Sequence, residues 1–435
     1  MNIDTAFKLF DVRGDYPEVV DERLAFIVGK SLALLKSPEK VLVTSDLRES
    51  SPSLKNYLAD GLSGEAKIYD LGNAPVPEFY YTVATGEFDL GVMVTASHLG
   101  NRENGFKFSD QNGLPFDQGE ILQLKNLVSK NIHFPIVVPK MEIINLNNSS
   151  NYIEEIISLL PQTNYKLNVL LDVSHSVVVN IVKILFSRLK INYKLFTDSP
   201  MGSPLFLENC QKFSKEIVNQ KADLGIKWDS DGDRVVFLNN EGKMLPPSFV
   251  LGILGANEKG KVVVDVRAGL VTRDLITEAG GSISILPAWG QYIKFAMQKD
   301  PEIVFGGETS GHFIYKSFHL IDDGIFAALK FLTLYEKPEI REKLKLLTKK
   351  YFEIPEKNFP VDLNKAAEIL EKLTEYYRKL NYDVSVEDGL TVFGKNFKFN
   401  LRPSLTEPFL RLNLEAQSET QSQEIIHELE KHLLV

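Results

Sequence analysis

The segment DSDGDR at residues 229–234 follows an apolar stretch and is the part of the sequence richest in possible metal ligands. Its three carboxylates stand at alternate positions, at Asp229, Asp231 and Asp233. In a looped or extended backbone they can converge on one hard cation, and Mg²⁺ favours oxygen ligands. A calcium loop begins similarly, but the acid that it needs at its twelfth position is an asparagine here. The spacing predicts a divalent-metal loop, with a solvated acidic turn as the alternative, and the adjacent Arg234 could hold a phosphate or sugar oxygen.

A second candidate site lies where an apolar run ends in TASH at residues 95–98 and is followed by NGFK at 104–107. A serine at a strand-to-loop junction is placed as a nucleophile should be, and His98 can donate to a phosphoryl oxygen or orient the Ser97 hydroxyl. Lys107 could neutralise the transferring group. No G-x-S-x-G elbow is present, so a hydrolase triad is not expected. The alternative is that these side chains only satisfy backbone groups at a strand end.

The glycine-rich segment GGETSGH at residues 306–312 is the third candidate. Its glycines would bring backbone amides close to a ligand. Glu308 and Ser310 could bind sugar hydroxyls, and His312 could act as a base or a hydroxyl contact. The glycines match neither G-x-G-x-x-G nor a phosphate-binding P-loop, so nucleotide binding is not predicted.

The fourth candidate is RPSLTEP at residues 402–408, with Arg411 on the strand that follows. Forked guanidinium donors and the hydroxyls of Ser404 and Thr406 suit a phosphate monoester, and Arg402 opens the turn. The alternative is a polar hairpin turn with a surface arginine. A serine nucleophile, a metal loop, a hydroxyl-binding loop and a phosphate clamp are together the parts that phosphoryl transfer on a phosphosugar requires.

Strand-like and helix-like segments alternate along the chain, which predicts an α/β architecture. Short apolar runs are typical of buried parallel strands; they span residues 40–46, 88–98, 165–174, 261–268 and 302–312. Ligands of open α/β sheets collect beyond the carboxyl ends of strands, and the candidate residues stand at those ends. A helix is expected over 177–189, and the C-terminal part combines a helix with alternating strands at 397–401 and 410–416.

The length of 435 residues is too great for one hydrophobic core, because cores stop growing at roughly 250–300 residues. We therefore expect three or four domains, with boundaries near residues 135, 240 and 350. As four domains these would be 1–135 with the serine loop, 136–240 with the metal loop, 241–350 with the sugar loop, and a C-terminal α+β domain at 351–435.

The net charge of −9 argues against a nucleic-acid partner, although local arginines and lysines can still form a basic cleft for a small phosphorylated substrate. No apolar run approaches the length of about 18 residues that a membrane span needs, and the N-terminus does not read as a secretory signal. Cys210 is the only cysteine, so no internal disulfide is possible, and we expect its side chain to be buried. The expected compartment is the cytoplasm.

The order of these motifs resembles that of the α-D-phosphohexomutase superfamily, the phosphomannomutases and phosphoglucomutases. FKLFDVRG at residues 7–14 is similar to that family's N-terminal F-x-x-Y-D-I-R-G. The TASH and NGFK segments resemble its phosphoserine loop, and DSDGDR resembles its metal loop. GGETSGH resembles its sugar loop, and RPSLTEP with the later arginine resembles its phosphate loop. The resemblance covers nearly the whole chain.

This resemblance implies a four-domain fold of three related α/β domains with mixed sheets and a smaller C-terminal α+β domain. It also implies a role for each matched residue. Ser97 would carry the phosphoryl group, and Mg²⁺ would be held by a phosphoserine oxygen and by Asp229, Asp231 and Asp233. The transferring phosphoryl would be surrounded by Arg13, His98, Lys107 and Arg234. Sugar hydroxyls would bind Glu308 and Ser310, with His312 beside them and Arg267 as a further substrate contact. The phosphate that does not react would be held by Arg402, Ser404, Thr406 and Arg411.

The activity implied is interconversion of hexose 1-phosphate and hexose 6-phosphate, of mannose or glucose or both, through a hexose 1,6-bisphosphate that also serves as activator. The partners would be hexose phosphates, with the chain a monomer or homodimer. A phosphoglucosamine mutase is an alternative, but that family usually has glutamine where Thr309 stands. A Mg²⁺-dependent phosphatase, in which water takes the phosphoryl group, and a non-catalytic phosphosugar-binding homologue are also compatible with these motifs.

Three segments depart from the family pattern. Leu99-Gly100 stand where the family usually has Asn-Pro, and loss of the proline is expected to loosen the serine loop. Leu405 stands where glycine is usual, so the phosphate clamp is expected to differ if that position needs a positive φ. The second domain has Ser174-His175-Ser176 in place of a glycine-rich turn.

Overall fold

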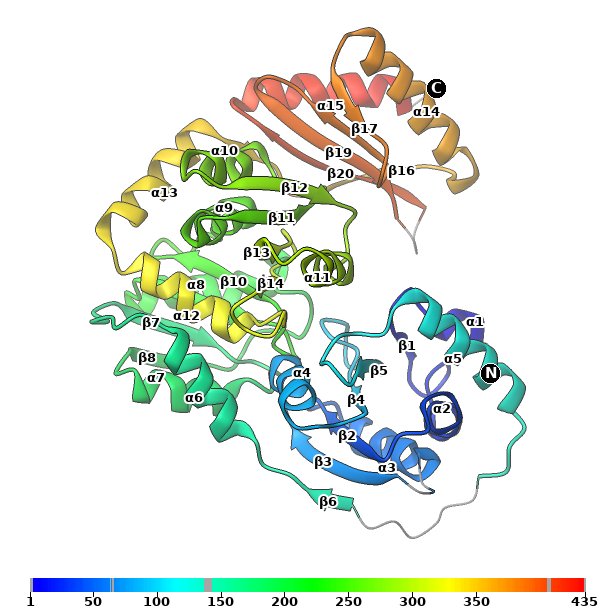
Figure 1. The fold of residues 1–435 in the computed structure, drawn as a ribbon. Coiled ribbons are helices and arrows are strands. Elements are labelled where there is room, and N and C mark those ends of the chain that lie inside the picture. Colours follow the sequence, from blue (N-terminus) through cyan, green and yellow to red (C-terminus); the bar gives the residue numbers. More distant parts are fainter. Residues whose placement is uncertain (1–2, 63, 65, 137–142, 405–407, 434–435) are drawn as a thin grey trace. The chain divides into compact units, whose positions relative to one another are not determined.

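Helices and strands alternate along the chain, and the strands of the described residues form four separate sheets (Figure 1). The computed structural model describes residues 3–62, 64, 66–136, 143–404 and 408–433. The chain divides into two compact units, and we describe each by itself. The first unit contains Met1–Met244 and Ser317–Thr333, and the second contains Leu245–Lys316 and Leu334–Val435.

The first sheet of the first unit has six strands in the order β1-β5-β4-β2-β3-β6. Its strands are β1 (Val12–Asp15), β2 (Lys40–Ser45), β3 (Lys67–Asn73), β4 (Leu90–Val94), β5 (Glu103–Asp110) and β6 (Ile143–Asn145). The strands β4, β2, β3 and β6 run parallel, whereas β5 is antiparallel to both β4 and β1. Strand β4 is buried along its whole length, as expected of a central parallel strand.

The second sheet of this unit has four strands in the order β10-β9-β7-β8. They are β7 (Asn168–Asp172), β8 (Asn192–Phe196), β9 (Leu224–Trp228) and β10 (Val235–Asn239). The strands β9, β7 and β8 are parallel, and β10 turns back antiparallel to β9.

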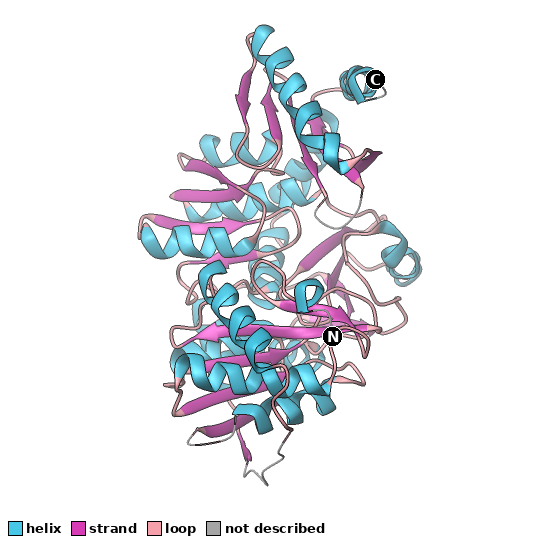
Figure 2. Ribbon diagram, turned by 90° about the vertical axis from the view of Figure 1, so that its right-hand side faces the viewer, coloured by secondary structure: helices cyan, strands magenta, loops and turns pink. Residues whose placement is uncertain are grey.

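Helices lie between these strands in sequence. Figure 2 draws the helices in cyan and the strands in magenta. They are α1 (Ile3–Ala6), α2 (Glu22–Lys36), α3 (Ser51–Leu62), α4 (Val76–Thr85), α5 (Gln118–Asn131), α6 (Ser149–Leu159), α7 (Val179–Arg188), the 3-10 helix η1 (Leu207–Cys210), α8 (Gln211–Gln220) and most of α12 (Gly324–Tyr335). Local sequence sets where these helices begin. Helix α5 begins with a capping box: the Asp117 side chain accepts from the backbone N–H of Glu120, and the Glu120 side chain accepts from the backbone N–H of Asp117.

The second unit contains a four-stranded sheet in the order β12-β11-β13-β14. Its strands are β11 (Lys261–Asp265), β12 (Ser282–Leu286), β13 (Ile303–Gly307) and β14 (Phe313–Tyr315). The strands β12, β11 and β13 are parallel, and β14 is antiparallel to β13.

The C-terminal sheet of the second unit is antiparallel throughout, in the order β15-β20-β19-β18-β17, with β16 also paired to β20. Its strands are β15 (Phe352–Glu353), β16 (Lys357–Pro360), β17 (Asp383–Ser385), β18 (Leu390–Phe393), β19 (Phe397–Pro403) and β20 (Phe409–Ala416). The helices of the unit are α9 (Pro247–Glu258), α10 (Leu270–Glu278), α11 (Gly290–Lys299), α13 (Pro338–Lys350), α14 (Leu363–Lys379) and α15 (Glu419–Leu433). The predicted mixed α/β class with an α+β C-terminal part is confirmed.

The first three sheets share one topology. Each contains three adjacent parallel strands, followed at one edge of the three by an antiparallel strand. The antiparallel strand forms a hairpin with its parallel neighbour. The strand orders are β3-β2-β4-β5, β8-β7-β9-β10 and β12-β11-β13-β14. The hairpins are β4–β5, β9–β10 and β13–β14, and their loops carry the serine, metal and sugar motifs respectively. The repeated topology therefore gives the three motifs equivalent positions.

Two further sequence expectations can be compared with the structure. Cys210 is buried, as expected, and burial raises the pKa of its thiol to about 11. Among the described residues, no helix is long and apolar enough to cross a membrane.

Candidate active site

The metal loop connects β9 to β10 and is fixed by backbone contacts on both sides. Asp231 O accepts from Val76 N at 2.8 Å, and Ser230 O accepts from Val177 N at 3.0 Å. Gly232 has a φ of +77°, and a Cβ there would lie 2.4 Å from Cγ1 of Val178. Only glycine meets both conditions, so the loop needs a glycine between its second and third aspartates.

The three aspartates of this loop are buried, and one ligand oxygen from each lies within 4.8 Å of the others. Oδ1 of Asp229 accepts from the backbone N–H of Gly232 at 3.1 Å and of Arg234 at 3.2 Å. Oδ1 of Asp231 is buried without a hydrogen-bond partner among the described residues. Burial, followed by the negative charges of the other two aspartates, raises the pKa of Asp229. Such a set of hard oxygen donors fits a divalent cation, which would offset the crowded charge.

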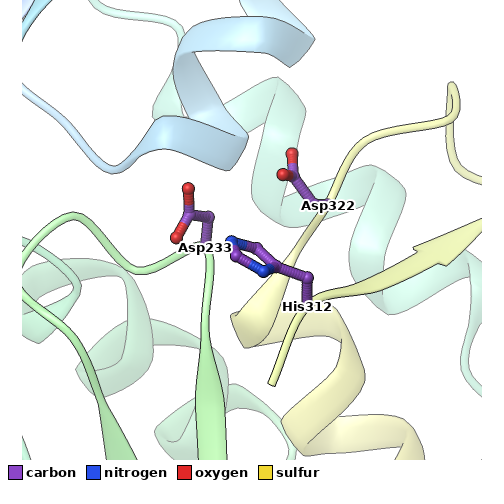
Figure 3. A group of neighbouring side chains, drawn as sticks. All are labelled: Asp233, His312 and Asp322. Atoms are coloured by element: carbon purple, nitrogen blue, oxygen red, sulfur yellow. The ribbon is translucent and has the colours of Figure 1, made fainter. Parts of the chain in front are cut away.

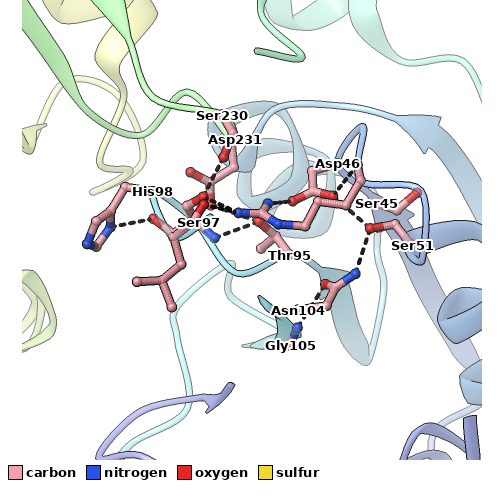
Figure 4. A network of polar contacts seen from close by, with 12 residues as sticks. Ser45, Asp46, Ser51, Thr95, Ser97, His98, Asn104, Gly105, Ser230 and Asp231 are labelled. Atoms are coloured by element: carbon pink, nitrogen blue, oxygen red, sulfur yellow. Dashed lines mark hydrogen bonds and ion pairs between the residues drawn. The ribbon is translucent and has the colours of Figure 1, made fainter. Parts of the chain in front are cut away.

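Ser97 stands at the start of the β4–β5 hairpin in a left-handed conformation, with a φ of +54°. This conformation is uncommon for a residue with a side chain, and hydrogen bonds hold it in place. The Ser97 N–H donates to Oγ1 of Thr95 at 2.9 Å, and the hydroxyl of Ser230 donates to the Ser97 carbonyl (Figure 4).

The Ser97 hydroxyl faces the metal loop. Its Oγ lies 3.5 Å from Oδ2 of Asp229 and 3.4 Å from Nδ1 of His98. Thr95 donates from Oγ1 to Oδ2 of Asp231 at 3.3 Å and so links the two loops (Figure 4). The serine motif and the metal motif, 132 residues apart in sequence, thus form one site within the first unit.

Lys107 on β5 also contacts this site. Its ammonium donates to Oδ2 of Asp231 at 2.8 Å and to Oδ2 of Asp233 at 2.6 Å. Burial acts to lower the pKa of Lys107, but the two carboxylates outweigh it and raise that pKa. The lysine is therefore charged and offsets part of the negative charge of the loop.

Two arginines belong to the same site. Arg13 on β1 donates to Oδ2 of Asp11 at 2.9 and 2.6 Å. Burial acts to lower its pKa, and the charge of Asp11, with those of Asp231 and Asp233, outweighs it. Nε of Arg234 lies 3.8 Å from Oδ2 of Asp229.

Asp322 is a further buried carboxylate beside the metal loop, and sequence reasoning missed it. A carboxylate oxygen of Asp322 and one of Asp233 lie within 4.8 Å of each other (Figure 3). His312, which Figure 3 also draws, belongs to the second unit. Asp322 lies 89 positions after Asp233 with no local motif around it, so nothing in the sequence pointed to it.

The sugar motif forms the β13–β14 hairpin of the second unit and centres on the buried carboxylate of Glu308. Oε1 accepts from the backbone N–H of Trp289 at 2.9 Å, and Oε2 accepts from the Ser310 hydroxyl at 3.0 Å. Nδ1 of His312 lies 3.0 Å from Oε2. Burial acts to raise the pKa of Glu308, but the hydrogen bond from His312 and the charge of Arg267 outweigh it, so the pKa is lowered. Glu308 is therefore an ionised acceptor.

The first two glycines of this motif have a packing role. A Cβ at Gly306 would lie 2.3 Å from Cγ2 of Ile293, and a Cβ at Gly307 would lie 2.6 Å from Cδ1 of Leu251. Both positions lie within β13, where neighbouring side chains fill the space beside the backbone. The close packing explains why both residues are glycines; that their amides approach a ligand stays a prediction.

Arg267 follows β11 and is engaged with carboxylates of its own unit. Its Nε donates to Oδ2 of Asp265 at 2.7 Å, and its Nη2 donates to Oε1 of Glu308 at 3.1 Å. Burial acts to lower the pKa of Arg267, and the charges of these two acids outweigh it. Arg267 thereby ties the end of β11 to the sugar motif.

The phosphate motif stands at the end of β19 and the start of β20. Arg402 and Arg411 are direct cross-strand partners, and Arg411 donates to the Ser404 hydroxyl at 3.2 Å. Nε of Arg402 is buried without a hydrogen-bond partner among the described residues. Burial and then the positive charge of Arg267 lower the pKa of Arg402. An arginine whose Nε has no partner among the described residues, beside a second arginine, suits an anion. Thr406 and Leu405 lie outside the described residues.

Sequence reasoning also missed Arg48, which contacts the serine loop directly. Its Nη2 donates to the carbonyls of Ser97 and Leu99, each at 2.8 Å. A signal was present: the pattern Asp-x-Arg occurs at 11–13, 21–23, 46–48 and 265–267, and the segments at 46–48 and 265–267 stand at the end of the first parallel strand of a repeated sheet.

These observations define the class of the protein. Repeated α/β sheets present, from equivalent hairpins, a buried serine beside a carboxylate triad and a loop built on an ionised glutamate, a combination suited to metal-assisted group transfer.

Comparisons with known proteins agree with this class. Residues 4–133 match the phosphoglucomutase/phosphomannomutase alpha/beta/alpha domain I, and residues 250–352 match domain III of the same family. The two matches together span more than half of the sequence. The chain belongs to the phosphoglucomutase/phosphomannomutase family of the phosphohexomutase superfamily.

Two curated relatives align over nearly the whole chain. The chain is 29% identical to a phosphomannomutase of Methanocaldococcus jannaschii over 97% of its length and 96% of that protein. It is 28% identical to a probable phosphoglucosamine mutase of Thermococcus gammatolerans, over 97% of this chain and 96% of that protein.

Two solved structures share the fold. A phosphoglucomutase/phosphomannomutase family protein of Burkholderia thailandensis has a TM-score of 0.87 at 22% identity, covering 99% of this chain and 97% of that one. An N-acetylphosphoglucosamine mutase of Aspergillus fumigatus, solved with GlcNAc-6P and magnesium, has a TM-score of 0.58 at 13% identity, covering 98% and 95%.

Proposed function

We propose that this protein is a phosphosugar mutase that interconverts hexose 1-phosphate and hexose 6-phosphate, with mannose or glucose or both as the sugar. One observation carries the proposal: Oγ of Ser97 lies 3.5 Å from Oδ2 of Asp229, at the edge of a buried carboxylate triad. Family membership supports the same activity, since the curated relatives include a phosphomannomutase.

In this proposal a phosphate carried on Ser97 passes to the free hydroxyl of a bound hexose phosphate. The Oγ–P bond of the serine breaks as the new O–P bond to the sugar forms, and His312 accepts the hydroxyl proton. The hexose 1,6-bisphosphate then turns over within the site. Its other phosphate returns to Ser97, and the proton returns to the oxygen that is released.

The residues around Ser97 would serve this transfer through charge and orientation. The cations Lys107, Arg13 and Arg234 would offset the negative charge of the phosphoryl oxygens, and His98, 3.4 Å from Oγ, would donate to one of them. A magnesium ion held by the aspartates of residues 229–233 would act as a Lewis acid on the transferring group. The donor set of hard oxygens supports this choice of metal; it includes Oδ1 of Asp231, which has no hydrogen-bond partner in the described part of the chain.

The second unit would supply recognition of the sugar and of the phosphate that does not react. Glu308 and Ser310 would bind hydroxyls that both orientations of the sugar present, with Arg267 holding Glu308 in place. The arginines 402 and 411, with Ser404 and Thr406, would bind the phosphate at the far end. Unused donor capacity at Nε of Arg402 supports this assignment.

A mutase assay tests the proposal. Purified protein with Mg²⁺, a trace of hexose 1,6-bisphosphate, and mannose 1-phosphate or glucose 1-phosphate is expected to form the 6-phosphate without free phosphate. Free phosphate alone would indicate a phosphatase. Neither product, from folded protein that binds Mg²⁺, would indicate a non-catalytic homologue.

Glucosamine 1-phosphate belongs in the same assay, because a relative of equal coverage is named a probable phosphoglucosamine mutase. A kcat/KM higher for glucosamine than for both other sugars would favour that second candidate. The boundaries of four domains near residues 135, 240 and 350, the monomeric or dimeric state and the cytoplasmic location stay predictions.

A further inference from the structure

The end of the first parallel strand is built alike in the three repeated sheets. Asp46 after β2, Asp172 at the end of β7 and Asp265 at the end of β11 each accept a hydrogen bond through Oδ1 from the backbone N–H two residues later, at 3.1, 3.0 and 3.0 Å. The other carboxylate oxygen of each aspartate pairs with a buried or partly buried cation. The three sheets thus share, at the same structural position, an aspartate that pairs with a cation.

The cation contacts the hairpin loop of its own sheet in the first and third cases. Arg48, anchored by Asp46, donates to carbonyls of the serine loop, and Arg267, anchored by Asp265, donates to Glu308 of the sugar motif. In the second sheet, Ser174 stands where the other two have arginine, and Lys227 of β9 pairs with Asp172 at 2.6 Å. There the contact to the metal loop comes from the Ser176 hydroxyl, which donates to Asp229 O at 2.6 Å.

Arg48 is the member of this set with the tightest surroundings. Its side chain is wholly buried, with one amino group on Asp46 and the other shared between Ser97 O and Leu99 O at 2.8 Å each. Asp46 is itself fixed, because the Ser51 hydroxyl donates to its Oδ1 at 2.7 Å and Asn104 donates to Ser51 at 3.0 Å (Figure 4). The guanidinium is therefore a rigid fork whose position is set by the sheet.

We propose that Arg48 is a positioning residue for the reaction: its fork holds the carbonyls of Ser97 and Leu99 so that Ser97 keeps its left-handed conformation and aims Oγ at the metal loop. The inference rests on the proposed function, in which Ser97 carries the phosphoryl group. The amino groups of Arg48 donate to Asp46 and to the carbonyls of Ser97 and Leu99, so Arg48 acts through Ser97.

Two physical reasons make this restraint effective in this chain. A residue with a Cβ at positive φ is strained by roughly 1–2 kcal/mol and relaxes unless its neighbours hold it. The loop also lacks the proline that would stiffen it, since Leu99-Gly100 follow His98. The planar fork binds two acceptors at once, which a lysine ammonium on a flexible stem does not reproduce with the same geometry.

The test compares Arg48→Lys with a matched control, Arg23→Lys. Arg23 also donates through one amino group to two backbone carbonyls of the first unit, Ile132 O at 2.6 Å and Phe134 O at 3.3 Å, but these lie outside the serine loop. Each protein is assayed for kcat, for KM of the hexose phosphate, for thermal midpoint, and for the ³¹P signal of the phosphorylated enzyme.

Arg48→Lys is expected to lower kcat by on the order of tenfold or more with KM changed by less than about twofold, and to shift or broaden the ³¹P signal. Arg23→Lys is expected to leave kcat, KM and the ³¹P signal unchanged. If Arg48→Lys does not fold, Asp46→Asn replaces it: the fork stays but loses its charged anchor, and a smaller fall in kcat with the same ³¹P change is expected.

Two results would overturn the proposal: wild-type kcat and ³¹P signal in Arg48→Lys, or equal losses of kcat in both arginine variants in step with their thermal midpoints. Ser97→Ala separates this failure from that of the proposed function. An inactive Ser97→Ala beside a fully active Arg48→Lys rejects only the positioning role. Activity in Ser97→Ala would reject the mutase mechanism and the positioning role with it.

Discussion

The ammonium of Lys107 lies 2.8 Å from Oδ2 of Asp231, inside the cluster of carboxylates that the metal loop presents. The same ammonium reaches Asp233 at 2.6 Å, so a cation from the serine hairpin already offsets part of the charge of the loop. A divalent cation entering the loop has to share these oxygens with the lysine or displace it. Lys107 is thus both a proposed partner of the phosphoryl group and a competitor of the metal.

Lys107→Met is expected to raise the affinity of the loop for Mg²⁺ while lowering turnover. With the ammonium gone, the carboxylates repel one another more strongly in the metal-free protein, and binding of Mg²⁺ relieves more repulsion. A tenfold gain in affinity corresponds to about 1.4 kcal/mol. The Mg²⁺ affinity is measured from the rise of the thermal midpoint as Mg²⁺ is added to protein that was first treated with EDTA.

Lys55→Met is the matched control for that experiment. Lys55 is partly buried and pairs with Asp70 at 2.8 Å, away from the metal loop. Its variant is expected to bind Mg²⁺ as the wild type does. A Lys107→Met protein whose Mg²⁺ affinity equals that of the wild type would show that the lysine does not compete.

Gly232→Ala is expected to displace the metal loop. The position combines a φ of +77° with a Cβ that would lie 2.4 Å from Val178, so strain and overlap add. Gly72→Ala separates the two effects, because Gly72 has the same φ of +77° but nothing within 4 Å of an added Cβ. We expect Gly72→Ala to cost about 1 kcal/mol of unfolding free energy and Gly232→Ala roughly 2–4 kcal/mol, with a clear loss of Mg²⁺ binding only in the latter. Equal losses in both variants would mean that Val178 moves aside.

Arg402→Met is expected to weaken substrate binding without weakening the fold. Among the described residues Nε of Arg402 has no hydrogen-bond partner, and the positive charge of Arg267 acts on the Arg402 guanidinium, so removal of Arg402 relieves repulsion in the ligand-free protein. KM for the hexose phosphate should rise on the order of tenfold to a hundredfold, while the thermal midpoint stays level or increases. Arg273→Met is the control, since Arg273 is exposed and pairs with the neighbouring Asp274 at 3.2 Å. An unchanged KM in Arg402→Met would remove Arg402 from the phosphate site.

Glu415→Gln is expected to flatten the pH dependence of stability between about pH 4.5 and 8. Glu415 is buried in β20 and accepts from Val271 N at 2.9 Å, and burial raises its pKa from 4.5 to about 8. The folded protein therefore holds a proton that the unfolded chain releases. This stabilisation is complete below about pH 4.5 and is lost as the pH rises through about 8.

Two neighbouring titratable groups also contribute to the pH dependence of stability and set the pH range of the measurement. Glu353, the cross-strand partner of Glu415 on β15, has its pKa raised by burial to about 7 and acts in the same direction. Lys398, its partner on β19, has its pKa lowered by burial to about 8, so its contribution rises with pH only above that value. Denaturant unfolding at pH 5 and pH 8 should show a wild-type loss larger by on the order of 2–4 kcal/mol than that of Glu415→Gln. Glu371→Gln, at an exposed position of α14, should follow the wild type.

Local pattern was enough to predict the strands that carry the site. The apolar runs at 40–46, 88–98 and 261–268 became β2, β4 and β11, because a buried parallel strand needs a continuous apolar run whatever surrounds it. The motif segments were placed at strand ends for the same reason.

Partners that come from distant segments could not be predicted. The carboxylates that hold Arg267 are Asp265, two residues away, and Glu308, forty-one residues away; only the fold brings the second one near. Arg48 was overlooked because its partners are backbone carbonyls, which leave no trace in residue type. The packing role of Gly306 depends on Ile293, which lies on another element.

The repeated hairpin has a consequence for how such a protein can diversify. In each of the three sheets the stem of the hairpin is fixed by a ladder of backbone hydrogen bonds, which depends little on the identity of the loop residues. One ancestral unit, copied along the chain, could therefore exchange the residues at a single tip without disturbing its frame. The nucleophile loop, the metal-binding loop and the hydroxyl-binding loop would then occupy equivalent positions on three copies of one frame. Each loop could change its residues to suit a new sugar while the other two stay unchanged.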